Sequence, residues 1–127
     1  MQPLLVDRVE PYAPGDESAS VTLRSATAVI EAFCFPCTLV PGTHVSTALQ
    51  ALDAELRSAY LVDWPEDVRA QRSAERLEKV GPYAYKGVAR VLDQSLGLIE
   101  VLGFVIDVGD VPCDGAVEFK ISRLDIR

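Results

Sequence analysis

The sequence predicts a β-rich α+β fold, built on a curved antiparallel sheet or on a small, partly closed barrel. Three observations predict it. Segments rich in Val, Ile, Thr and Phe, separated by Gly and Pro, recur along the chain. Helical spacing of apolar residues is confined to the middle, between residues 47 and 80. The last third holds three consecutive strand-like segments with short connections, which is typical of an antiparallel meander.

Residues 1–20 are expected to form an extended N-terminal arm, and residues 21–127 the globular body of a single domain. Several prolines punctuate the arm, and Pro14-Gly15 predicts a turn. The apolar residues between Leu4 and Val9 allow the arm either to dock on the body or to form a short edge strand.

Residues 21–35 predict a strand, because Val, Thr, Ile and Phe dominate the segment. One face would carry Ala28, Ile30, Ala32 and Cys34, and the other Val29, Glu31, Phe33 and Phe35. Both faces are largely apolar. We therefore expect a central strand.

The first of two expected helices spans residues 47–61. Its apolar residues recur at helical spacing, and they are Leu49, Leu52, Leu56 and Tyr60. Thr47 with Gln50 fits a capping box at the start of this helix.

The second expected helix runs from Pro65 to Lys79. Proline suits the first helical turn, and Gly81-Pro82 marks a stop. Few of its residues are apolar, so most of its surface is expected to face solvent.

Three strands are expected over residues 83–92, 98–108 and 116–126. The last strand alternates between apolar and polar residues up to Ser122-Arg123, where the phase slips and predicts a bulge or bend. Gly87 and Gly103 lie inside strands and indicate strong curvature. These features favour an OB-like barrel, while an α+β sandwich with helices on one sheet face remains the alternative.

The charge of the chain excludes several functions. Its 127 residues carry 12 basic and 19 acidic side chains, giving a net charge of −7 and a pI of about 4.6. This balance disfavours non-specific binding to nucleic acid or to anionic membranes. The uncharged stretch 32–52 is broken by Pro36 and Pro41, so it does not predict a membrane span. We expect a soluble cytoplasmic protein with reduced cysteines, because the N-terminus does not resemble a secretory signal.

The pair of cysteines in Cys34-Phe35-Pro36-Cys37 suggests two alternatives. A thiol-redox function would use the pair directly. A structural zinc site would be formed by Cys34, Cys37, His44 and Cys113. Without either function, Cys34 is a small buried hydrophobe and Cys37 a loop residue.

A further alternative is an OB-like domain that binds single-stranded nucleic acid, which needs stacking aromatic rings beside basic residues. The candidate residues for this binding surface are Tyr83, Tyr85, Lys86, Arg90 and Phe104. The net negative charge opposes this function, except on a local patch of the sheet. Lys86, Arg90, Lys120 and Arg123 punctuate the final strands and could form such a patch.

The favoured function is a non-enzymatic protein-interaction module that associates with itself or with another protein. No phosphate-binding glycine motif, dinucleotide fingerprint or metalloprotease helix is present, and no catalytic residues are assigned. An apolar strand face left uncovered by the helices would form the contact surface, most simply for a symmetric homodimer. The acidic charge would also suit a basic partner.

Overall fold

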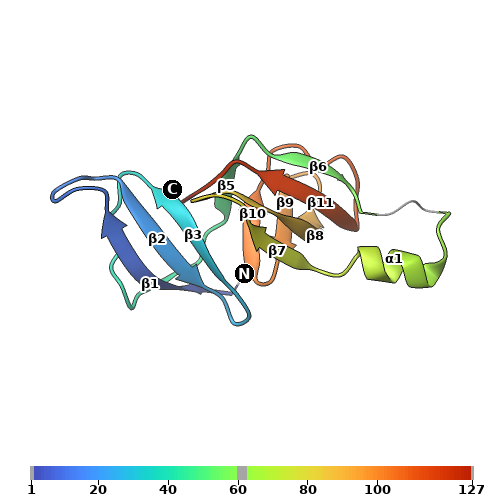
Figure 1. Cartoon of the computed structure of the whole chain (residues 1–127), viewed down its shortest axis with the longest axis horizontal. Coiled ribbons are helices and arrows are strands. Elements are labelled where there is room, and N and C mark those ends of the chain that lie inside the picture. The colour runs from blue at the N-terminus through green and yellow to red at the C-terminus, as the bar shows by residue number, and fades with distance from the viewer. Residues whose placement is uncertain (1, 60–62, 127) are drawn as a thin grey trace.

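The computed structural model describes residues 2–59 and 63–126, and within them it has twelve strands in one mixed sheet and a single short helix (Figure 1). The prediction of a β-rich fold is confirmed. The sheet is not closed into a barrel in this part of the chain, and the OB-like arrangement is not confirmed.

The N-terminal third forms a meander of β1 (Leu4–Pro11), β2 (Ala19–Arg24) and β3 (Val29–Cys34). β4 (His44–Val45) adds a short edge strand beside β1. The residues expected to form an N-terminal arm thus supply a full strand, which buries Leu4 and Val6 in the core.

The single strand predicted over residues 21–35 is wrong, because the chain turns back between β2 and β3. Ser25 makes this turn: its amide donates to the Ala28 carbonyl oxygen at 2.9 Å, and its hydroxyl accepts from the Ala28 amide at 3.0 Å. Local hydrogen bonding by serine competes with the extended ladder and ends the strand.

The helix predicted over residues 47–61 is also wrong over residues 47–59, while Tyr60 and Leu61 lie outside the described residues. The chain there forms β5 (Leu49–Leu52) and β6 (Glu55–Ser58), with a bend at Asp53, whose φ is 54°. The leucines do not share a buried face, because Leu49 is 0% exposed whereas Leu52 is 41% exposed. Pairing with strands from the far end of the chain overrides the local helical pattern.

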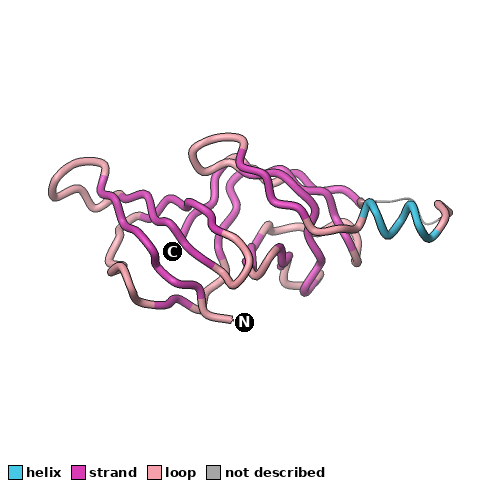
Figure 2. The backbone as a smooth tube through the Cα atoms, turned by 60° about the horizontal axis from the view of Figure 1, so that its bottom comes forward, coloured by secondary structure: helices cyan, strands magenta, loops and turns pink. Residues whose placement is uncertain are grey.

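The second helix is shorter than predicted. α1 (Glu66–Arg72) ends at Ser73, whose amide and hydroxyl both donate to the Arg69 carbonyl oxygen. The chain then continues as β7 (Arg76–Lys79), an edge strand beside β8 (Tyr85–Asp93). No residue of α1 is buried, which fits the expected solvated surface, and Figure 2 shows the helix beyond one end of the strands.

The predicted strand 98–108 is a hairpin of β9 (Leu98–Val101) and β10 (Phe104–Asp107). Its two-residue turn places Leu102 at φ 48° and Gly103 at φ 90°, so Gly103 marks a reversal rather than curvature. The strained Leu102 is held at both ends. Its amide donates to Glu75 Oε2 at 2.8 Å, and its carbonyl oxygen accepts from the Ser25 hydroxyl at 2.6 Å.

The last segment bends at Ser122, as predicted, between β11 (Ala116–Ile121) and β12 (Arg123–Ile126). β11 pairs with β8 and β6 rather than continuing a meander from β10, so the predicted strand order is wrong here. β12 pairs with β5 and, in parallel, with β3. The Ser122 amide donates to the Leu52 carbonyl oxygen at 3.1 Å, which places this bend beside the one at Asp53.

The order of strands along the sheet is β4-β1-β2-β3-β12-β5-β10-β9-β8-β11-β6, with β7 added beside β8. β11 and β12 are consecutive in the chain yet lie far apart in this order, so the sheet curls around one hydrophobic core. The largest fully buried side chains of this core include Leu23, Ile30, Leu49, Ile99, Phe104, Ile121 and Leu124. No helix among the described residues has the length and apolar character needed to cross a membrane.

Candidate interaction surface

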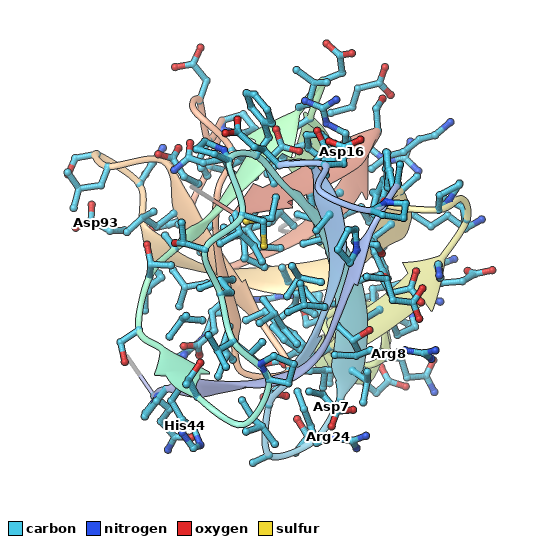
Figure 3. The ribbon with its side chains drawn as sticks, turned by 90° about the vertical axis from the view of Figure 1, so that its left-hand side faces the viewer. Asp7, Arg8, Asp16, Arg24, His44 and Asp93 are labelled. Atoms are coloured by element: carbon cyan, nitrogen blue, oxygen red, sulfur yellow. The ribbon has the colours of Figure 1, made fainter. Side chains whose placement is uncertain are left out.

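The four predicted zinc ligands are not gathered by the fold. Cys34 ends β3 and is buried, and Cys37 follows in the next loop. His44 is exposed on β4, opposite Leu5. Figure 3 shows His44 in the lower part of the view with Asp7 and Arg24, whereas Asp16 lies at the top. Within residues 2–59 and 63–126, no three His, Cys, Asp or Glu side chains are grouped so that they could hold a metal ion.

The thiol of Cys34 is poorly suited to redox or nucleophilic chemistry. Burial, together with a hydrogen bond and charge interaction with Cys37, raises the pKa of Cys34 to about 12. Only a thiolate attacks or exchanges efficiently, so this environment suppresses the reactive form at neutral pH. Cys34 packs in the core as a small hydrophobe.

The predicted nucleic-acid surface is dispersed. Phe104 is 0% exposed and Tyr85 is 3% exposed, so neither ring can stack on a base. The Tyr85 hydroxyl instead accepts a hydrogen bond from the Glu31 amide at 2.8 Å. Arg90 is engaged by Glu100. Of the predicted residues, Tyr83, Lys86 and Arg90 are accessible to solvent, and Tyr83 and Lys86 belong to two different surfaces described below.

An aromatic cluster lies on the outer face of β3, and its members are Tyr12, Phe33 and Tyr83. The Phe33 ring is 5.9 Å from each tyrosine ring, measured between centroids. The two tyrosine hydroxyls share a hydrogen bond. Partial burial and this hydrogen bond raise the pKa of Tyr12 to about 12, so its phenol stays neutral at physiological pH. Three segments that are distant in sequence thus form one ordered patch.

A guanidinium lies over this cluster. The central carbon of the Arg123 guanidinium lies 4.7 Å from the Phe33 ring centroid, in cation–π geometry. Arg123 is fixed by a two-point contact, because its Nε donates to Asp125 Oδ1 at 2.7 Å and its Nη2 to Oδ2 at 3.0 Å. Asp125 is 6% exposed, and it anchors the cation from β12.

The rim of the cluster is apolar on one side and acidic on the other. Val29 is 43% exposed and Phe35 is 56% exposed, and both follow the outer face of β3. A small hollow of about 170 Å³ lies between Phe33, Phe35 and Arg123. Asp16 and Glu17 lie in the turn between β1 and β2; the Glu17 carbonyl oxygen accepts from the Cys37 amide at 2.7 Å.

We name these residues together the aromatic face: Tyr12, Val29, Phe33, Phe35, Tyr83 and Arg123. The sequence predicted that Val29, Glu31, Phe33 and Phe35 share a strand face. β3 places Val29, Glu31 and Phe33 on one face, where Glu31 pairs with Lys79, and Phe35 follows the end of the strand. The sequence left open whether helices cover this face, and no helix among the described residues packs on it. Tyr12 was not predicted, because no local pattern indicates that the β1–β2 turn reaches Tyr83 across 71 positions.

Comparison of the chain with protein family models, with curated proteins and with solved structures finds no match.

Proposed function

We propose that the protein is a non-enzymatic interaction module that binds a basic protein segment through its aromatic face. The observation that carries this proposal is the open aromatic cluster, in which Phe33 is held between two tyrosines and beneath Arg123. Tyrosine, other aromatic residues and arginine dominate the energetic centres of protein interfaces.

The cluster is ordered before any partner arrives. The hydrogen bond between the tyrosine hydroxyls and the fork between Arg123 and Asp125 fix these side chains. Binding to fixed rings avoids much of the entropy cost of immobilising side chains at an interface.

Charge indicates the chemistry of the partner. Asp16 is close enough to Tyr12 to help raise the pKa of its phenol, Glu17 follows Asp16 in the same turn, and the whole chain carries −7. Acidic residues on one side of the cluster favour lysine or arginine side chains, through charge attraction and through cation–π contacts with the tyrosine rings, since Arg123 already lies over Phe33. A symmetric homodimer through the same face would bring Asp16 and Glu17 of two copies together. We therefore favour a different, basic partner over the self-association expected from the sequence.

Selection from a displayed peptide library on the immobilised protein tests this proposal. We expect enriched peptides to be basic, and Phe35→Ser and Tyr12→Ser to weaken their binding at least about tenfold, the loss that removing an interface anchor causes. The matched control is Leu96→Ser, because Leu96 is 64% exposed but lies in the β8–β9 connection.

Two results would contradict the proposal. One is enrichment of peptides that bind the Phe35→Ser protein and the wild type equally. The other is sedimentation of the wild type as a dimer that Phe35→Ser dissociates, which would assign the aromatic face to a second copy of the chain.

A further inference from the structure

A second surface, independent of the aromatic face, lies at the other end of the sheet. A hollow of about 890 Å³ is lined by strands β6, β7, β8 and β11. Figure 1 shows these strands on the side of the molecule away from β1 and β2. The size falls within the range of small-molecule binding sites.

Strand register defines the charges that line this hollow. Pairing aligns one row across the four strands, and this row is Glu78, Lys86, Lys120 and Glu55. The next row on the same face carries Arg76 at one end and Glu118 with Arg57 at the other. The hollow therefore has four cations and three anions, whereas the whole chain has 12 basic and 19 acidic residues.

The two lysines of the central row lie directly opposite each other on β8 and β11. Like charges in this arrangement destabilise a sheet unless an anion lies between them. Lys86 has only a long contact, 3.8 Å from its Nζ to Glu78 Oε2. Lys120 has no carboxylate within ion-pair distance in the described part of the chain.

The second row adds one more available cation. Arg57 is occupied, because its Nε lies 2.5 Å from Glu118 Oε2. Arg76 forms no ion pair with any described carboxylate. Arg76 is diagonal to Lys86 across the β7–β8 ladder, so three cations flank the centre of the hollow.

We infer that this hollow binds a small molecule bearing an oxyanion group, a phosphate or a carboxylate, held by Lys86, Lys120 and Arg76. A bound oxyanion would relieve the repulsion between the two lysines and would accept charge-assisted hydrogen bonds from all three side chains. Glu55 and Glu78 bound the same row and repel a long polyanion. This arrangement favours a small ligand over a nucleic-acid strand.

Titration of the ¹⁵N-labelled protein, followed by amide chemical shifts at fixed ionic strength, tests the inference. One arm uses inorganic phosphate and a second uses succinate, so that the two oxyanion chemistries are distinguished. We expect saturable shifts at the amides of Lys86, Lys120 and Arg76 in at least one arm. The Lys120→Gln variant should bind that oxyanion about tenfold or more weakly than the wild type, which is the loss typical of one charge-assisted contact.

Arg24→Gln is the control, because it makes the same charge change on β2, where Arg24 pairs with Asp7. It should leave the affinity unchanged. Lys86→Gln provides a second variant in case Lys120→Gln perturbs the fold. The inference is overturned if the shifts rise without saturation in both arms, or if both lysine variants bind as the wild type does. Neither result bears on the aromatic face.

Discussion

The thiol of Cys34 shows how burial decides reactivity at a single residue. Cys34 is 4% exposed, and the pKa of its thiol is raised to about 12. We expect alkylation by iodoacetamide at pH 7.5 to be at least about tenfold slower at Cys34 than at an unperturbed peptide thiol. Only a small fraction of the Cys34 thiol is deprotonated at this pH, and the reagent cannot easily reach the buried sulfur. Mass spectrometry of the modified peptide measures this rate, with Cys37→Ser to isolate the site. Rapid labelling of the native protein would restore the thiol-redox alternative.

The raised pKa of Cys34 determines whether the free energy of unfolding rises or falls with pH. A thiol with a higher pKa in the folded state binds its proton more tightly there than in the unfolded chain. The free energy of unfolding should therefore fall as pH rises from about 9 to about 12, the window set by Cys34. Urea unfolding of the wild type and of Cys34→Ala across this window measures the difference. Identical slopes in the two proteins would exclude Cys34 as the source.

Arg123 contributes to stability as well as to the aromatic face. Replacing it with Met keeps the aliphatic stem but removes both hydrogen bonds to the buried Asp125. We expect the free energy of unfolding to fall by about 1–2 kcal/mol. This is less than the cost of breaking a fully buried ion pair, because the Arg123 side chain is 39% exposed and solvent screens its charge. Denaturant unfolding measures it. Arg8→Met, at an exposed pair with Glu10, is the control and should cost almost nothing.

At the scale of elements, the attachment of β7 depends on Gly87. A Cβ atom added there would lie 1.9 Å from the Arg76 carbonyl oxygen, so backbone must move. We expect Gly87→Ala to cost about 1–3 kcal/mol and to remove hydrogen-exchange protection from β7 first. Gly81→Ala is the control, since its nearest contact is the Ala84 Cβ at 3.1 Å. Unchanged protection in β7 would show that the strand is held by other contacts.

The sequence predicted strands correctly where the local spacing of apolar residues agrees with the strand pairing in the folded protein. Val117, Phe119 and Ile121 alternate and are all buried, and the bend after them was placed correctly. Leu49 and Leu56 fit a helical period equally well, yet they belong to strands that pair with β12 and β11. Nothing in residues 47–61 encodes those partners, which pair with β5 and β6 across 59 to 75 positions.

The candidate surfaces were harder to predict than the elements, for the same reason. The sequence placed Phe33 and Phe35 on one strand face but could not bring Tyr12 or Tyr83 to it. Lys86 and Lys120 were recognised as basic residues on the final strands, while their direct opposition depends on the register between β8 and β11. Interaction surfaces are assembled by tertiary pairing, whereas local patterns report only one strand at a time.

The whole molecule has one core despite its elongated sheet. The bent pairs β5–β6 and β11–β12 run from the middle of the sheet to its β6 end, and residues of both ends of the sheet belong to the same buried cluster. Val21 on β2 and Val117 on β11 are both 0% exposed. A single core predicts that these two ends unfold together rather than as separate units.

Native-state hydrogen exchange across a series of denaturant concentrations measures this coupling. We expect the amides of Val21 and Val117 to converge on one free energy of opening, equal to that of global unfolding by circular dichroism. α1 should exchange at lower free energy, because none of its residues is buried and its N-cap residue makes no side-chain hydrogen bond. Two distinct free energies for the strand amides would mean that the bends at Asp53 and Ser122 separate two folding units, and that each candidate surface lies on a unit of its own.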